Sequence, residues 1–174
     1  MTDTRPDVDT VVRCVEELRG WLGSYPEDVA AVRDLLLSEA PSLRSRMVAA
    51  GVLNYQIRKM DLSPDWLPEI GRADDVLVLR TGAEVFAINN LHELTDTDQA
   101  TVDRLRGEDA TVEQLLGQPL HAALFRRVRG LLERRIHGRT PEEIVTDEAK
   151  RRGFLDELEA HVEAYRPPEI ADPA

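Results

Sequence analysis

Residues 74–90 read DDVLVLRTGAEVFAINN, and apolar side chains recur in this stretch at steps of three or four residues. Such spacing places an apolar stripe along one face of an α-helix. The stripe comprises Val76, Leu79, Ala83 and Phe86, widened by Leu77, Val85 and Ile88. Its breadth predicts a central helix that packs on several sides. A short buried strand over residues 76–79 is the alternative, but the chain has no second β-rich run to pair with it.

The same periodicity predicts helices on both sides of this stretch. We expect them over residues 8–22, 27–36, 42–57, 96–107, 108–116, 119–138 and 141–165. Residues 96–107 are polar enough to form a long loop instead. The tetrapeptide Thr140-Pro141-Glu142-Glu143 matches a capping box, which begins the last helix, and Gly153 is expected to bend it.

These elements predict an all-α fold, a compact bundle of about six or seven helices. A length of 174 residues suits one domain with a single core, which we expect over residues 1–166. Because Pro167, Pro168 and Pro173 cannot continue a helix, residues 167–174 are predicted to be a disordered tail.

The composition excludes several classes of protein. The formal net charge of -11 and a pI near 4.8 argue against nucleic-acid binding through the overall field. The single cysteine, Cys14, excludes an intrachain disulfide and a cysteine-rich metal site, and we expect it to be a buried structural thiol in a reducing compartment. The first nine residues carry three aspartates and no apolar run, so we expect no secretory signal.

The least generic segment is DLSPDWLPEIGRADD, residues 61–75. Ser63 and Pro64 are a helix-start signal, Pro68 ends that short helix, and Gly71 permits a positive φ. Asp74 is then expected to be the N-cap of the central helix, with Asp75 complementing the helix dipole. The segment predicts a helix-turn-helix corner punctuated by proline and glycine. Its candidate site residues are Asp61, Pro64, Asp65, Trp66, Pro68, Gly71, Asp74 and Asp75.

This segment resembles the signature of the YkvA-like family, also called domain of unknown function 1232. The family pattern is Asp-Leu-Ile-Pro-Asp, two apolar residues, Pro, two residues, Gly, two residues and Asp-Asp. The residues that fall on it are Asp61, Leu62, Pro64, Asp65, Pro68, Gly71, Asp74 and Asp75. Tyr55 is similar to a tyrosine that precedes the motif, so the resemblance covers residues 49–79. It implies a helical fold, and the family has no settled biochemical activity.

Several members of that family are associated with membranes and enter the motif through a strongly apolar helix. Here the corresponding residues are Gln56, Ile57, Arg58, Lys59 and Met60. The basic pair argues against insertion into a membrane. We therefore expect a soluble, cytoplasmic protein that is at most peripheral to a membrane.

Four aspartates of the corner could provide oxygen ligands to a hard cation such as Mg²⁺ or Ca²⁺: Asp61, Asp65, Asp74 and Asp75. The alternative is that each caps a helix or pairs with Arg58, Lys59 or Arg72. We favour this alternative, and hence no cofactor, because aspartate is common before helices and the spacing does not match an EF-hand loop.

A basic segment follows further along the chain. Between residues 126 and 139 there is one acid, Glu133, and six arginines: Arg126, Arg127, Arg129, Arg134, Arg135 and Arg139. Leu124, Val128, Leu131 and Leu132 add an apolar stripe, which predicts a basic amphipathic helix. It could bind an anionic membrane surface, an acidic or phosphorylated partner, or another subunit. The favoured alternative is a solvated face that offsets nearby acids.

The histidines do not indicate an active site. His92, His121, His137 and His161 lack the paired spacing of a zinc hydrolase. We therefore predict a non-enzymatic helical interaction or adaptor module with a protein partner, in a bacterial assembly or at a membrane surface. The bacterial source is suggested by twenty arginines against two lysines. A metal-dependent enzyme built on the aspartates of the corner is the alternative function.

Overall fold

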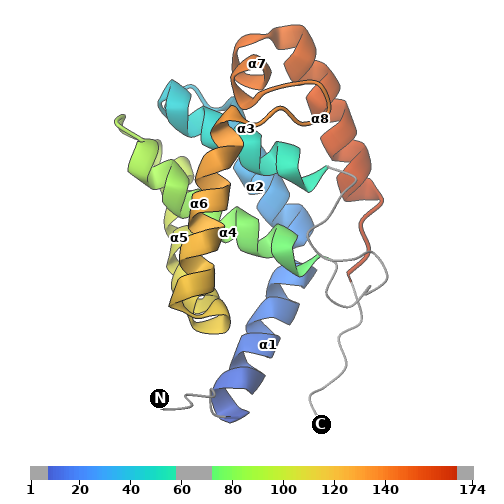
Figure 1. Ribbon diagram of the computed structural model, residues 1–174. Helices are drawn as coiled ribbons and strands as arrows, with labels where there is room; N and C mark the ends of the chain where they lie inside the picture. Colours follow the sequence, from blue (N-terminus) through green and yellow to red (C-terminus); the bar gives the residue numbers. More distant parts are fainter. Residues whose placement is uncertain (1–7, 58–71, 168–174) are drawn as a thin grey trace.

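The computed structural model describes residues 8–57 and 72–167. Within those ranges the chain forms α-helices and one short 3-10 helix, and it contains no β-strand (Figure 1). The helices are α1 (Val8–Gly23), α2 (Tyr25–Leu37), α3 (Leu43–Gln56), α4 (Ala73–Asn89), α5 (Asp96–Leu116), α6 (Gln118–Gly130), η1 (Leu131–Glu133), α7 (Pro141–Thr146) and α8 (Glu148–Glu163). The predicted all-α fold is confirmed, and the strand alternative for residues 76–79 is excluded.

Helix α4 occupies the middle of the bundle, as the sequence predicts. It packs against α1, α2, α3, α5 and α6 (Figure 1). Every residue from Asp75 to Ala83 is buried, so no side of this part of the helix faces solvent. A helix buried all round needs apolar residues on every side, which explains the broad stripe.

Two glycines allow α3 to pack closely against its neighbours. A Cβ atom added at Gly82 of α4 would lie 2.6 Å from Cγ2 of Val52 in α3. A Cβ atom added at Gly51 of α3 would lie 3.1 Å from the main-chain oxygen of Leu131 in η1. The close packing of α3 against α4 and η1 therefore depends on glycine, which has no side chain, at these two positions.

The helix expected in two pieces over residues 96–116 is a single element, α5, and the loop alternative is wrong. Val102, Leu105 and Val112 are buried at helical steps across the expected break, whereas Gly107 is exposed. A glycine in a helix costs about 1 kcal/mol, and packing of this continuous apolar face outweighs that cost.

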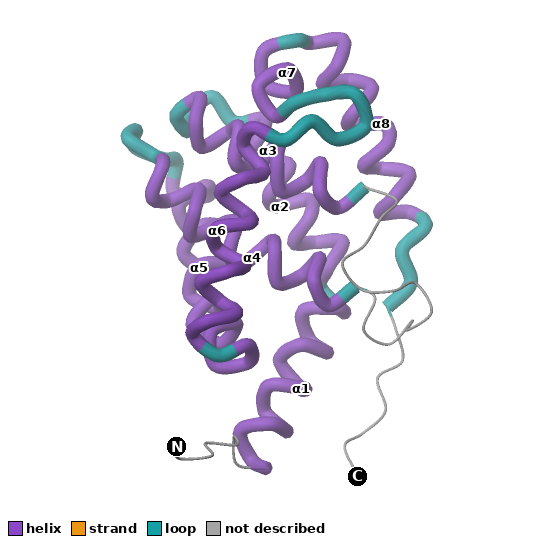
Figure 2. Tube along the Cα trace, viewed as in Figure 1, coloured by secondary structure: helices purple, strands orange, loops and turns teal. Residues whose placement is uncertain are grey.

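The expected helix over residues 119–138 is wrong in its second half. Helix α6 ends at Gly130, and Leu131 and Leu132 turn inward in η1 to pack against α3. His137 and Gly138 then take positive φ angles of 49° and 76°, which reverse the chain in the loop before α7 (Figure 2). An α-helix cannot continue through such residues.

The last expected helix is two helices, α7 and α8. The predicted capping box is confirmed, because the side chains of Thr140 and Glu143 each bond the other's main-chain N–H. The break falls at Asp147, whose carboxylate caps α8 by accepting a hydrogen bond from the N–H of Lys150. Gly153, where a bend was expected, lies inside α8.

The structure also bears on Cys14, on the C-terminal tail and on the question of a membrane span. Cys14 is free and buried on α1. The tail predicted after residue 166 lies outside the described residues apart from Pro167. Among the helices described for this chain, none has both the length and the apolar composition that a membrane crossing requires.

Gly82→Ala should destabilise the protein by about 1–3 kcal/mol, because the added methyl group overlaps Val52 in a tightly packed crossing. This loss should exceed the gain of up to about 1 kcal/mol that alanine brings to a helix. Urea unfolding of the wild type and the variant measures the net change in the free energy of unfolding.

The matched control is Gly153→Ala in α8, where an added Cβ meets no atom within 4 Å. It should raise the free energy of unfolding by about 0.5–1 kcal/mol. Equal effects at the two positions would show that the α3–α4 crossing does not require a glycine.

Candidate functional site

The structure describes only the end of the predicted corner. Asp61, Pro64, Asp65, Trp66, Pro68 and Gly71 lie outside the described residues. Asp74 and Asp75 lie in the first turn of α4, which begins at Ala73 with Arg72 at the N-cap position. The expected N-cap role of Asp74 is therefore wrong, although both carboxylates lie where the helix dipole favours negative charge.

The two helices that flank the corner are joined by polar contacts. The Tyr55 hydroxyl near the end of α3 donates a 2.8 Å hydrogen bond to Oδ2 of Asp74. The side-chain amide of Gln56 donates to the main-chain oxygen of Asp75 at 3.4 Å. These bonds hold the end of α3 beside the start of α4.

A buried polar cluster connects this junction to α2 and α8. The Tyr25 hydroxyl donates to Oε1 of Gln56 at 3.1 Å and lies 3.0 Å from Nε2 of His161. The Tyr165 ring packs 4.6 Å from the Tyr25 ring, and its hydroxyl donates to the main-chain oxygen of Leu22 at 2.6 Å. The cluster fastens the C-terminal end of α8 to the start of α2.

Burial shifts the titration of two members of this cluster. Burial, together with the positive charge of Arg72, lowers the pKa of His161 below its ordinary value. Burial raises the pKa of Tyr165 to about 12. Both side chains are therefore neutral at pH 7. A neutral His161 whose Nε2 carries the proton can donate to Tyr25 while Tyr25 donates to Gln56, so one bond does not exclude the other.

A second buried cluster contains four charges at the centre of the bundle. Arg80 of α4 is fully buried, and its Nη2 lies 2.8 Å from Oδ2 of Asp28 in α2. Its Nε lies 2.7 Å from Oε2 of Glu108 in α5, a close ion pair but not a well-aligned hydrogen bond. Arg104 of α5 completes the set, with Nη2 2.8 Å from Oδ1 of Asp28. Two cations and two anions thus balance.

Two neutral groups also satisfy Arg80. Its Nη1 donates to the main-chain oxygen of Val76 at 3.1 Å, and its guanidinium lies 4.4 Å from the centre of the Trp21 ring. Burial lowers the pKa of Arg80, and the carboxylates of Asp28 and Glu108 oppose that shift. The sequence pattern gave no sign of this cluster, because Arg80 sits within an apolar run.

Asp109 forms a third polar contact between helices. It accepts a 2.8 Å hydrogen bond from the Thr81 hydroxyl, and its second oxygen lies 2.9 Å from Nε2 of His121. In a catalytic triad the histidine stands between the acid and the hydroxyl. Here the acid stands between the other two, so His121 cannot take a proton from Thr81, and the contact is structural.

The described residues contain no group of three or more histidine, cysteine, aspartate or glutamate side chains that could hold a metal ion. Asp61 and Asp65 are not among them. The alternative of a metal site at the corner is therefore not tested by the described residues.

The six arginines of the basic segment do not share one face. Arg126, Arg129 and Arg134 are exposed, whereas Arg127 is half-buried. Arg135 pairs with Glu143 at 3.1 Å. Arg139 is buried, bonds Glu157 and Asn54, and lies over the Phe154 ring. Only part of the segment is therefore available to a ligand.

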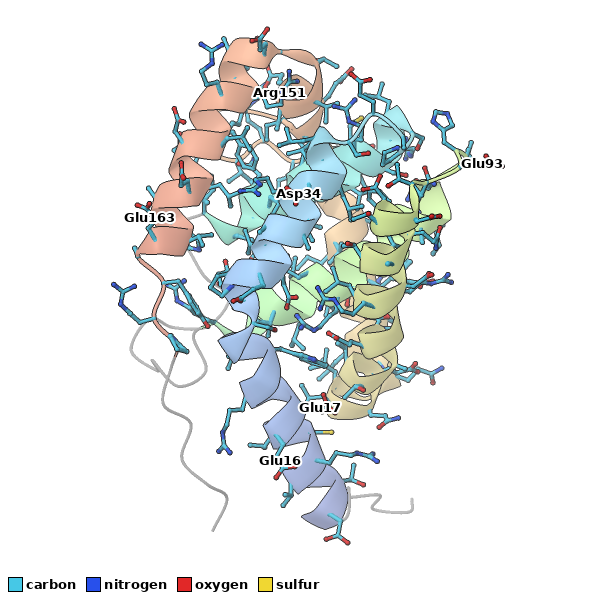
Figure 3. The ribbon with its side chains drawn as sticks, turned by 180° about the vertical axis from the view of Figure 1, so that it is seen from behind. Glu16, Glu17, Asp34, Glu93, Arg151 and Glu163 are labelled. Carbon is cyan, nitrogen blue, oxygen red and sulfur yellow. The ribbon has the colours of Figure 1, made fainter. Side chains whose placement is uncertain are left out.

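A groove lies between α2 and α8 on the face opposite to that of Figure 1 (Figure 3). It has a volume of about 470 Å³. Its apolar lining comprises Val29, Ala30, Leu37, Leu155, Leu158 and Val162. Its charged residues are Arg33, Asp34, Asp156, Glu159 and Glu163. Figure 3 shows Asp34 on α2 and Glu163 on α8 at this groove.

The two helices leave the groove open because α8 rests mainly on α3 and α7. The contact between Tyr25 and His161 joins α2 to α8 at one end of the groove. Leu37, 42% exposed, lines the opposite end. No sequence pattern revealed this groove, since it is formed by two helices more than a hundred residues apart.

Residues 45–80 match the family model described as protein of unknown function (DUF1232). Over these residues the chain is similar to the DUF1232 family. Neither curated proteins nor solved structures gave a significant match. The resemblance stated from the motif is thereby confirmed.

The DUF1232 match covers most of α3 and the first half of α4, and its last residue is the buried Arg80. It therefore includes the junction of Tyr55 and Asp74. It includes neither the α2–α8 groove nor the arginines of the basic segment, so the family gives no information about those surfaces.

Arg80→Met should destabilise the protein by about 3–5 kcal/mol, because Asp28 and Glu108 would lose a buried counter-charge. The measurement is chemical unfolding at pH 7. The control is Arg152→Met, which removes an exposed pair with Glu148 within α8 and should change stability by less than about 0.5 kcal/mol. A loss below about 1 kcal/mol for Arg80→Met would contradict the role given to this cluster.

Stability should fall as the pH is lowered through the ordinary pKa of His161. Its pKa is depressed in the folded state, so below about pH 6.5 the unfolded chain binds a proton that the folded chain resists. His161→Gln should therefore lose less stability than the wild type between pH 7.5 and pH 5. Urea unfolding of both proteins at the two pH values measures the difference, and identical pH dependence would contradict it.

Proposed function

We propose that this chain is a non-enzymatic helical interaction module, and that the α2–α8 groove binds a basic amphipathic helix of a protein partner. The observation that carries the proposal is an apolar floor bordered by acids in one open groove. A free, buried Cys14 agrees with a cytoplasmic setting.

The shape of the groove favours a helical ligand. Its two walls are helices, so a third helix can lay one apolar face against both. Leu37, already 42% exposed, would be covered by such a ligand.

The charges of the groove favour a basic ligand. Asp156, Glu159 and Glu163 are spaced by three and four residues, so they follow one face of α8. None of the three forms an ion pair with another described residue. The fourth acid, Asp34, is bound by its neighbour Arg33. A helix carrying arginine or lysine beside its apolar face would meet uncompensated negative charge on α8.

A designed peptide tests this proposal. It carries leucines at positions i, i+3 and i+7 and arginines beside them, with a fluorescent label for anisotropy. The full-length protein should bind it, and an otherwise identical peptide with glutamates in place of the arginines should not bind. Glu159→Arg should weaken binding by roughly tenfold, and added salt should weaken binding to the wild type.

The matched control is Glu17→Arg on α1, which makes the same charge change at an exposed residue away from the groove (Figure 3). It should leave binding within about twofold of the wild type. Equal weakening by Glu159→Arg and Glu17→Arg would refute the groove as the contact surface. Self-association that Leu37→Asp abolishes would identify a second copy of the chain as the occupant instead.

A further inference from the structure

A surface depression of about 280 Å³ gathers three arginines from two helices. Arg44 belongs to the first turn of α3, and Arg126 and Arg129 belong to the end of α6. Asn89 at the end of α4 and Glu133 of η1 also line the depression. We propose that this depression binds a phosphate group, as free phosphate or a small phosphate monoester.

The three helices converge here because the end of α6 lies beside α3 (Figure 2) and because α4 packs against both. Arg44 is held in place: its Nε donates a 2.9 Å hydrogen bond to Oδ1 of Asn89. The amide of Asn89 in turn donates to the main-chain oxygen of Val85 at 2.7 Å. This leaves the two terminal nitrogens of Arg44 available to a ligand, and a positioned guanidinium loses less entropy on binding.

The charges here are not balanced by acids. Within residues 8–57 and 72–167, Arg44, Arg126 and Arg129 form no ion pair, although acids greatly outnumber bases in the chain. By contrast, seven other arginines do pair with acids: Arg33, Arg80, Arg104, Arg106, Arg135, Arg139 and Arg152. Three arginines against Glu133 give the lining a net charge of +2.

The position of Arg44 cannot be explained by helix electrostatics. Arg126 and Arg129 lie near the C-terminus of α6, where the dipole favours cations. Arg44 lies in the first turn of α3, where the dipole disfavours them, and that turn contains no acid. A phosphate ligand would compensate this unfavourable placement of a cation.

The side chains suit phosphate. A guanidinium can make two parallel hydrogen bonds to phosphate oxygens, and a phosphate monoester carries about -1.5 to -2 charges at pH 7. That charge matches the local balance of +2.

Titration of the full-length protein with inorganic phosphate, followed by NMR or calorimetry at constant ionic strength, tests the proposal. Binding should be saturable, with a dissociation constant of roughly 1 mM or tighter. Arg126→Gln combined with Arg129→Gln should weaken it by at least about tenfold, and Arg44→Gln by several-fold. Thermal unfolding confirms that each variant is folded.

The matched control is Arg134→Gln, which removes an exposed arginine of the same basic segment that does not line the depression. It should leave the dissociation constant unchanged. Equal weakening by this variant, or a linear response without saturation, would overturn the proposal in favour of general attraction between charges.

A second arm distinguishes the source of the phosphate group. Co-sedimentation of the protein with vesicles that contain phosphatidic acid is measured and compared with the titration of free phosphate. Binding to vesicles without binding to free phosphate would also overturn the proposal and would identify an anionic membrane surface as the ligand. Glu159→Arg should leave phosphate binding intact, so failure here and failure of the α2–α8 groove are separate results.

Discussion

The burial of Arg80 constrains the whole bundle. Taking a guanidinium out of water costs several kcal/mol, which only well-placed counter-charges and hydrogen bonds can offset. Its partners come from three other helices: Trp21 of α1, Asp28 of α2 and Glu108 of α5. These helices must therefore keep fixed positions around α4. The apolar residues of α4 favour burial in any orientation, whereas the ionic contacts favour one.

The bonding of other polar side chains inside the bundle also bears on function. Asp109 is used by Thr81 and His121, and Tyr25 is used by Gln56 and His161. In each case a group that could take part in acid–base chemistry is already bonded to another part of the protein. Within residues 8–57 and 72–167, the two surfaces that we propose for ligands are the α2–α8 groove and the arginine-lined depression.

The sequence predicted the fold well because helical periodicity is a local property. The capping box at Thr140 and the central position of α4 follow from residues within one turn or one stripe. The errors fell where tertiary packing overrides local signals: Gly107 is tolerated inside α5, and Leu131 turns inward and ends α6. The α2–α8 groove and the partners of Arg80 depend on helices that meet only in the folded chain, so no spacing could reveal them.

The two proposed surfaces differ in how far their charge can act. A net charge of -11 favours the approach of a basic helix, and the acids of α8 add to that attraction at the groove itself. The same net charge repels a phosphate group, but salt screens this repulsion beyond the Debye length, about 8 Å at physiological ionic strength. Phosphate recognition must therefore come from direct contact with Arg44, Arg126 and Arg129, which makes it sensitive to their geometry. The α2–α8 groove, by contrast, can tolerate considerable variation in the spacing of the partner's basic residues.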